Sequence, residues 1–135
     1  AYPFEIPYRL LNMYSVHGDT VLDPFWGTGT TTLAAMVAGR DSVGYELGSE
    51  FLAHFEERVG SVPSLSEQVI ADRLNAHHEF VAECRADGAE LGYDADYYEF
   101  PVRTKQEQGI RFYEACAVEG VDGADRRYRV AYDPV

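Results

Sequence analysis

The feature that most constrains the fold is a short apolar segment that passes through two glycines into a helix. Residues 20–25 read Thr-Val-Leu-Asp-Pro-Phe, a short apolar run with a proline near its end, which predicts a buried parallel strand. Trp26 to Gly29 forms a glycine-bearing loop. Thr30 to Ala38 predicts a helix that is capped by a threonine and ended by Gly39.

The next segment repeats this order. Residues 41–47 predict a second strand, and residues 50–59 predict a second helix that ends at Gly60. Strands that alternate with helices at this spacing indicate a parallel sheet of the α/β class.

A different pattern begins near Ser61. Residues 64–91 predict one long helix with a single apolar stripe, and Ser64 with Glu67 fits a capping box at its start. Residues 110–118 and 128–132 predict a hairpin whose loop contains Asp122-Gly123. The stripe consists of Ile70, Leu74, His77, Val81, Cys84 and Gly88.

The loop after the first strand carries the chemistry. Gly27 and Gly29 remove side chains where a ligand must approach the backbone closely. The helix that begins near Thr30 offers unpaired N–H groups and a positive dipole end, which suit an anionic group such as a carboxylate. Glu46, at the tip of the second strand, can accept hydrogen bonds from both hydroxyls of a ribose. Thr32 stands where a nicotinamide-type motif has its third glycine, and no phosphate-binding G-x-x-x-x-G-K-[ST] is present.

These residues resemble the permuted branch of the DNA amino-methyltransferases, which modify exocyclic amines of adenine or cytosine. The resemblance covers residues 1 to about 58. It is carried by Ala1-Tyr2-Pro3 through Ile6-Pro7, by the run from Tyr14 to Thr31, and by Gly44-Tyr45-Glu46-Leu47. Trp26 departs from the family, which usually has a small residue there; it packs against either the cofactor or a neighbouring strand.

The resemblance implies an α/β fold with a partial Rossmann-like class I methyltransferase sheet, a long helix and a C-terminal β-hairpin. Residues 1–60 would form the S-adenosylmethionine-binding half of the methyltransferase domain, and residues 61–135 an extension packed on it. The expected cofactor is S-adenosyl-L-methionine. Its expected binding residues are Tyr2, Pro3, Asp23, Phe25, Gly27, Gly29, Thr30, Thr31 and Glu46.

The family's catalytic loop is not in this sequence. That loop contains a Pro-Pro pair and stacks on a flipped base, and no two of the six prolines are adjacent. We therefore expect no catalytic residue here, a missing half that lies N-terminal of Ala1, and contact with DNA through that half. The chain alone is expected to be inactive. The alternatives are a stand-alone cofactor-binding subunit of a split enzyme and an RNA or small-molecule methyltransferase of the same fold.

Composition limits the remaining choices. Asp and Glu total 23 against 11 Lys and Arg, which gives a net charge of −12. Most proteins that bind nucleic acid instead carry a basic surface that supplies affinity. A solvated acidic surface and a segment that does not itself touch DNA both explain it. Two cysteines without a pairing pattern favour a reducing cytoplasm. No apolar run is long enough for a membrane helix, and no metal site is expected at His77-His78. The resemblance leaves open whether the whole enzyme has a restriction endonuclease partner.

The C-terminal part is rich in aromatic residues, for which we expect core packing rather than base stacking. A basic cluster near the predicted hairpin loop leaves a phosphate contact as a further alternative; it consists of Arg126, Arg127 and Arg129.

Overall fold

A computed structural model describes residues 2–122 and 126–135, so Ala1 and residues 123–125 of the predicted hairpin loop, Gly123 included, lie outside the described residues. The chain forms two compact units. The first unit comprises residues 1–67 and 114–133, and the second comprises residues 68–113 and 134–135. The division into domains at residue 60 stays a prediction.

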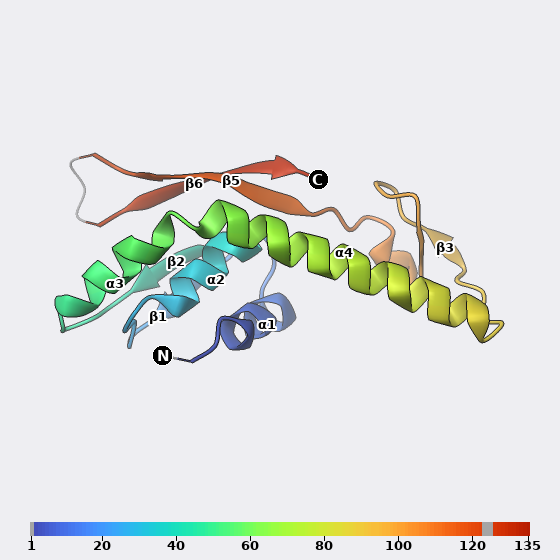
Figure 1. Cartoon of the computed structure of the whole chain (residues 1–135), viewed down its shortest axis with the longest axis horizontal. Helices are drawn as coiled ribbons and strands as arrows, with labels where there is room; N and C mark the ends of the chain where they lie inside the picture. The colour runs from blue at the N-terminus through green and yellow to red at the C-terminus, as the bar shows by residue number, and fades with distance from the viewer. Residues whose placement is uncertain (1, 123–125) are drawn as a thin grey trace. The chain divides into compact units, whose positions relative to one another are not determined.

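The first unit contains the expected alternation of strands and helices (Figure 1). Helix α1 spans Glu5–Tyr14, strand β1 Thr20–Asp23, helix α2 Thr30–Ala38, strand β2 Asp41–Gly44 and helix α3 Glu50–Val59. Both predicted helices therefore have their expected bounds, whereas both strands end earlier than expected. Strands β1 and β2 pair in parallel, with Thr20 opposite Asp41 and Asp23 opposite Gly44. The α/β class is confirmed.

Helix α2 supplies much of the core of the first unit. Leu33, Ala34 and Ala35 are at most 2% exposed, because the helix is apolar on nearly all sides. Its C-terminus ends at Gly39 in the left-handed conformation, with φ of 72°, as predicted. Its N-cap is Gly29 with φ of 74°, and no side chain caps the helix. The predicted threonine cap is therefore wrong, because the chain must make a left-handed turn at that position and glycine allows it.

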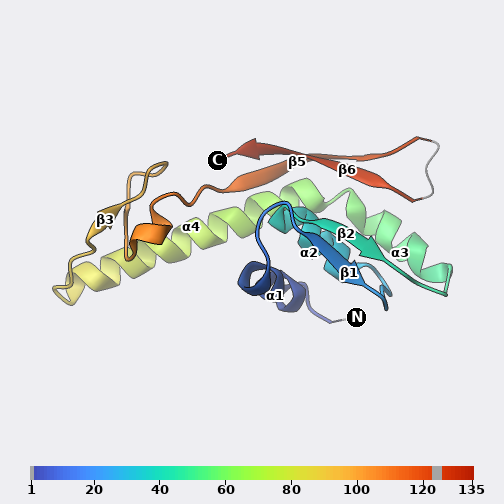
Figure 2. The same cartoon turned by 180° about the vertical axis from the view of Figure 1, so that it is seen from behind.

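One face of the β1–β2 pair is open. Figure 2 shows the two strands toward the viewer with α2 behind them. On this face Leu22 lies opposite Val43, and the two side chains are 62% and 46% exposed. Among the described residues β1 pairs with β2 alone, so its other edge carries no strand. A sheet with only two parallel strands leaves such an edge available for pairing with another strand.

The C-terminal hairpin belongs mostly to the first unit. Strand β5 spans Tyr113–Gly120 and strand β6 spans Tyr128–Pro134, so the predicted hairpin is confirmed with shifted ends. The Tyr132 hydroxyl donates to the Met36 carbonyl of α2 at 2.6 Å. The ring of Tyr128 packs edge-on against Phe55, with centroids 5.4 Å apart.

Helix α4 spans Val62–Ala86 and contributes its first turns to the first unit and its remainder to the second. It starts before Ser64 and ends well before residue 91, so the capping box at Ser64 is wrong. The apolar stripe is confirmed along the helix, with Ile70 and Val81 each 5% exposed. Gly88 lies beyond the helix end.

The rest of the second unit is a loop-rich layer with short elements. Strands β3 (Tyr93–Asp94) and β4 (Pro101–Val102) pair antiparallel, and a 3₁₀ turn, η1, spans Lys105–Glu107. A capping box formed by Thr104 and Glu107 starts this turn. The Tyr98 ring stacks on Phe100 at 5.0 Å and lies 5.9 Å from Phe112.

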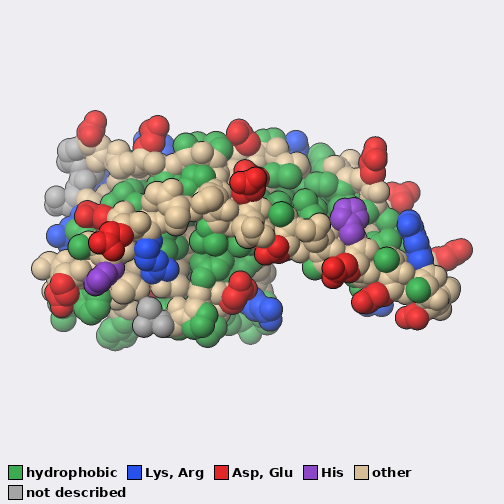
Figure 3. All heavy atoms as spheres, viewed as in Figure 1, with side chains coloured by type: hydrophobic (Ala, Val, Ile, Leu, Met, Phe, Trp, Pro, Cys, Tyr) green, Lys and Arg blue, Asp and Glu red, His purple; other side chains and the backbone are tan. Residues whose placement is uncertain are grey.

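Within the described residues, no helix is long and apolar enough to cross a membrane. The same part of the chain contains no group of three His, Cys, Asp or Glu side chains suited to hold a metal ion. The Nε2 of His77 instead donates to the carbonyl of Pro101 at 2.9 Å. Acidic side chains are spread over the face in Figure 3.

Candidate cofactor-binding site

The loop between β1 and α2 begins at Asp23, the last residue of β1. Its Oδ1 accepts a hydrogen bond from the backbone N–H of Phe25 at 3.1 Å, which fixes the turn. Its Oδ2 is buried and has no hydrogen-bond partner among the described residues. A buried carboxylate oxygen without a donor carries a desolvation cost. The geometry therefore fits a ligand that brings a cationic or N–H donor to this position.

Glu46 joins the two loops that follow the two strands. One carboxylate oxygen accepts from the N–H of Gly27 and the other from the N–H of Gly48, both at 2.8 Å. The backbone N–H groups of Gly48 and Gly27 hold the pKa of this carboxyl below its usual range. Each ionised oxygen keeps a further lone pair, so the group can still accept from two ligand hydroxyls.

The two glycines of the loop have different roles. Gly27 has a φ of 54°, and a Cβ built there would meet only the Phe25 carbonyl, at 4.0 Å. This side of Gly27 is open, as a ligand approach requires. A Cβ on Gly29 would lie 2.5 Å from the Phe55 ring and 2.7 Å from Trp26. A side chain at position 29 is therefore excluded by the packing of Phe55 and Trp26 and by the left-handed N-cap of α2. The space beside Gly29 is filled by protein side chains and not left open for a ligand.

Trp26 packs inward, against the neighbouring strand. Its Nε1 donates to the Thr32 hydroxyl at 2.8 Å, and its ring lies 4.9 Å from that of Phe55. A Cβ on Gly44 of β2 would come within 2.0 Å of the indole. Of the two roles that the sequence left open, the structure supports packing against β2.

Arg58 is a residue that the sequence did not single out. From the last turn of α3, its Nη1 donates to the Thr28 carbonyl and to the Thr30 hydroxyl, each at 3.3 Å. Thr30 itself is 4% exposed. Arg58 therefore connects α3 by hydrogen bonds to the glycine loop and to the first residue of α2. A separation of about 30 residues leaves no sequence signal for such a contact.

The N-terminal element reaches the same helix. The hydroxyls of Tyr2 and Thr31 are hydrogen-bonded at 2.7 Å. Pro3 starts the turn into α1, where its carbonyl accepts from the N–H of Ile6. Phe25 extends outward and is 87% exposed. Five of the nine expected residues thus lie on the loop, lie at the start of α2, or hydrogen-bond to one of these: Tyr2, Asp23, Gly27, Thr31 and Glu46. Cofactor contact by any of the nine stays a prediction.

Comparison with known proteins matches these residues to a family. Residues 1–57 match the model of a DNA methylase family. Over 113 residues, 84% of this chain, the sequence is 50% identical to the Type II methyltransferase M.MthZI of Methanothermobacter thermautotrophicus. Over 60 residues, 44% of this chain, it is 52% identical to the Type II methyltransferase M.MjaI of Methanocaldococcus jannaschii. The matched segments cover 30% and 20% of those relatives.

Among solved structures, a protein from Thermus thermophilus is similar to part of this chain. It is described as a putative DNA modification methylase and is complexed with S-adenosyl-L-methionine. The identity is 47%, the match covers 42% of this chain and 24% of that one, and the TM-score is 0.41. The matches to the family model and to the two archaeal proteins agree that residues 1–57 of this chain are similar to DNA methylases.

Proposed function

We propose that this chain binds S-adenosyl-L-methionine and is the cofactor-binding, C-terminal part of a DNA methyltransferase that modifies the exocyclic amine of adenine or cytosine. The match to the family model and the relatives' names support this proposal. The chain spans less than a third of those relatives, so the activity is one of a longer protein.

One observation carries the proposal: two carboxylates lie where two parallel strands end, on either side of a glycine loop. The buried Oδ2 of Asp23 lacks a donor, which the α-ammonium group of the cofactor would supply. Glu46 would accept from the ribose hydroxyls. The N-terminus of α2 would hold the methionine carboxylate, because its first N–H groups have no acceptor within the helix.

When bound, the cofactor supplies an electrophilic methyl group on sulfur. This chain's residues bind and orient it, and holding two reactants in position is a large part of catalysis in transfer reactions. None of the described residues is assigned a catalytic role. The purified chain is therefore expected not to methylate DNA by itself, and methylated DNA in such an assay would contradict the proposal.

Calorimetry with S-adenosyl-L-methionine tests the binding site. We expect wild type to bind and Glu46→Ala to bind at least about tenfold more weakly, because charge-assisted hydrogen bonds are lost. Glu57→Ala is the matched control, since Glu57 is an exposed acid on α3 with the same charge. It should bind like wild type.

A cofactor analogue without the ribose hydroxyls separates contact from loop damage. If Glu46 binds the ribose, Glu46→Ala should lose less affinity for this analogue than for S-adenosyl-L-methionine. If the loss is the same for both ligands, Glu46 acts only through the loop and the ribose assignment fails.

A second candidate is a separate subunit that supplies the cofactor to a partner carrying the catalytic loop. The exposed pair Leu22 and Val43 favours a covering partner chain or domain in either case. A continuous upstream reading frame with a Pro-Pro-Tyr type loop supports one enzyme, and a start codon just before Ala1 supports the subunit.

A cytoplasmic location and a restriction endonuclease partner belong to the same proposal. The first is supported by Cys84 and Cys116, which form no disulfide. The second is supported by the Type II names of the relatives. DNA contact by the complete enzyme is supported by the match to the DNA methylase family.

A further inference from the structure

The second unit contains a cavity of about 340 Å³ with aromatic walls. Phe80, Tyr98, Phe100 and Phe112 line it. Tyr98 and Phe100 are stacked on each other nearly parallel, with an interplanar angle of 6°. The volume falls within the range typical of small-ligand pockets.

Two arginines line this cavity, and the guanidinium group of each lies over an aromatic ring. The guanidinium carbon of Arg73 lies 4.7 Å from the centroid of Phe112, and that of Arg103 lies 5.4 Å from the centroid of Phe80. A guanidinium that covers a ring with its face still directs its N–H groups outward in its own plane. Among the described residues, the side chain of Arg103 has no hydrogen-bond acceptor or ion-pair partner.

The charged residues that line this cavity differ in balance from those of the whole chain, which is acidic. Of the described residues, the only acid that lines this cavity is Glu107, whose carboxylate accepts from the backbone N–H groups of Arg103 and Thr104, both at 2.9 Å. Two arginines and one acid therefore line this cavity, in a chain with a net charge of −12.

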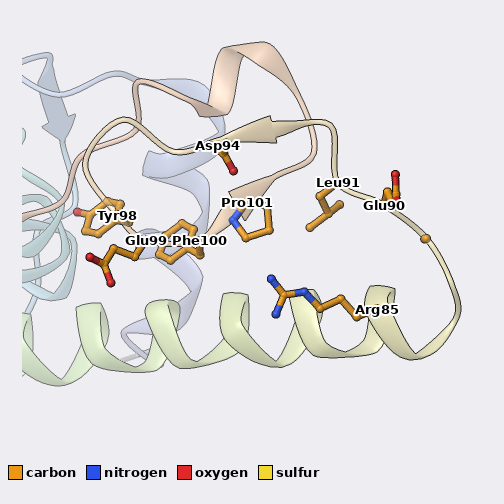
Figure 4. Close-up of a pocket in the computed structure, with 9 residues that line it drawn as sticks. Arg85, Glu90, Leu91, Asp94, Tyr98, Glu99, Phe100 and Pro101 are labelled. Carbon is orange, nitrogen blue, oxygen red and sulfur yellow. The ribbon is translucent and has the colours of Figure 1, made fainter.

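A neighbouring cavity of about 560 Å³ provides the contrast (Figure 4). It shares Tyr98 and Phe100 but is lined by Glu90, Asp94 and Glu99 against the single cation Arg85. Two cavities with a common aromatic wall thus differ in the sign of their charge. Anion binding is therefore expected in the smaller cavity and not in the larger one.

We propose that the smaller cavity binds a nucleotide, with the base stacked on the aromatic wall and the phosphate bound by Arg103. Aromatic walls stack bases without sequence preference, and arginine binds phosphate through paired N–H donors. Both a free nucleotide and one unit of a single-stranded DNA carry this chemistry. The site is independent of the proposed cofactor site, because its residues all belong to the second unit.

Binding to the full chain is measured with two probes, thymidine 5′-monophosphate and a labelled single-stranded oligothymidylate. A pyrimidine is chosen because it differs from the adenosine of the proposed cofactor. We expect Arg103→Gln to weaken binding about tenfold or more, because a hydrogen bond to a charged group is lost. Arg85→Gln removes the same charge from the neighbouring cavity and should leave binding unchanged. Thymidine without phosphate should bind about tenfold more weakly than the monophosphate.

The two probes distinguish a free nucleotide from a DNA strand as the ligand. Binding of the monophosphate alone assigns a free nucleotide, and binding of the oligonucleotide alone assigns a DNA strand. Binding of neither probe, or equal loss in Arg103→Gln and Arg85→Gln, overturns the proposal. An excess of S-adenosylhomocysteine should not displace either probe, and displacement would place them in the first unit instead. Far-ultraviolet circular dichroism of both variants checks that they fold.

Discussion

The carboxylate of Glu46 accepts a hydrogen bond from the N–H of Gly27 at 2.8 Å, across the ends of two parallel strands. With the bond from Gly48 at the same distance, this single side chain holds the glycine loop and the following loop together. The group that we propose to bind ribose therefore also organises the site before the cofactor arrives.

The first prediction concerns acid. Because the backbone N–H groups of Gly48 and Gly27 lower the pKa of Glu46 below 4.5, the folded state favours the ionised form. Its stabilising effect is present above pH 4.5 and is lost as the pH falls through the lower folded-state pKa. Urea denaturation should show that Glu46→Gln is less stable than wild type at neutral pH and that the difference shrinks toward acid pH.

The exposed Glu57 serves as the control for this measurement. Glu57→Gln removes the same charge from an exposed position and should have nearly the stability of wild type at neutral pH. A wild-type advantage over Glu46→Gln that persists unchanged in acid would show that the hydrogen bonds do not depend on the charge.

The second prediction separates the two glycines of the loop. Gly27→Ala meets no close neighbour, so it should cost only about 1–2 kcal/mol for the left-handed backbone. Gly29→Ala adds a clash with Phe55 and Trp26 and should destabilise the fold more. Thermal denaturation gives the stabilities, and calorimetry gives the cofactor affinity at a temperature where both variants are folded. If a ligand approaches Gly27, its alanine variant loses affinity despite being the more stable; unchanged affinity would remove Gly27 from the site.

The third prediction tests how Trp26 is packed. An alanine at Gly44 would place its Cβ 2.0 Å from the indole, so Gly44→Ala should destabilise the chain by about 1–3 kcal/mol. Trp26→Leu makes room for that methyl group, so the double variant should be more stable than the sum of the single changes predicts. Circular dichroism in urea measures all four proteins. Additive losses would mean that Trp26 does not face Gly44.

The fourth prediction concerns alkali and the hairpin. Burial, with a smaller effect from Asp41, raises the pKa of Tyr132 to about 12. The unfolded chain ionises this phenol near pH 10, so stability should fall between pH 10 and 12 as the unfolded state loses its proton first. Tyr132→Phe removes this part of the pH dependence and, at neutral pH, costs about 1 kcal/mol for the hydrogen bond to Met36. The exposed Tyr14 gives the control, since Tyr14→Phe should keep the alkaline loss of stability.

The sequence predicted those parts of the molecule that depend on local pattern. The bounds of α2 and α3 follow from apolar composition and from glycines at their ends, and the stripe of α4 follows from its spacing. The helix start at Val62 could not be predicted, because Ser64 matches a capping box that the chain does not use. The same motif forms at Thr104 instead, around a short turn.

Contacts between distant residues could not be predicted either. Arg58 reaches Thr28 and Thr30 only because α3 packs beside the loop, and Tyr132 reaches Met36 from 96 residues away. The inward position of Trp26 depends on two glycines in different elements, Gly29 and Gly44. No single sequence window contains these partners.

The bond from Tyr132 to Met36 also sets an order of events during synthesis. The glycine loop and α2 leave the ribosome before the hairpin, and the carbonyl of Met36 obtains this partner only after β6 has emerged. Nearly one hundred residues are synthesised in the interval, and a partly synthesised chain exposes apolar surface during that time. Ribosome-bound chains halted before Tyr128 should therefore be cleaved by protease within α2, whereas chains in which Tyr132 has left the ribosome should resist cleavage there.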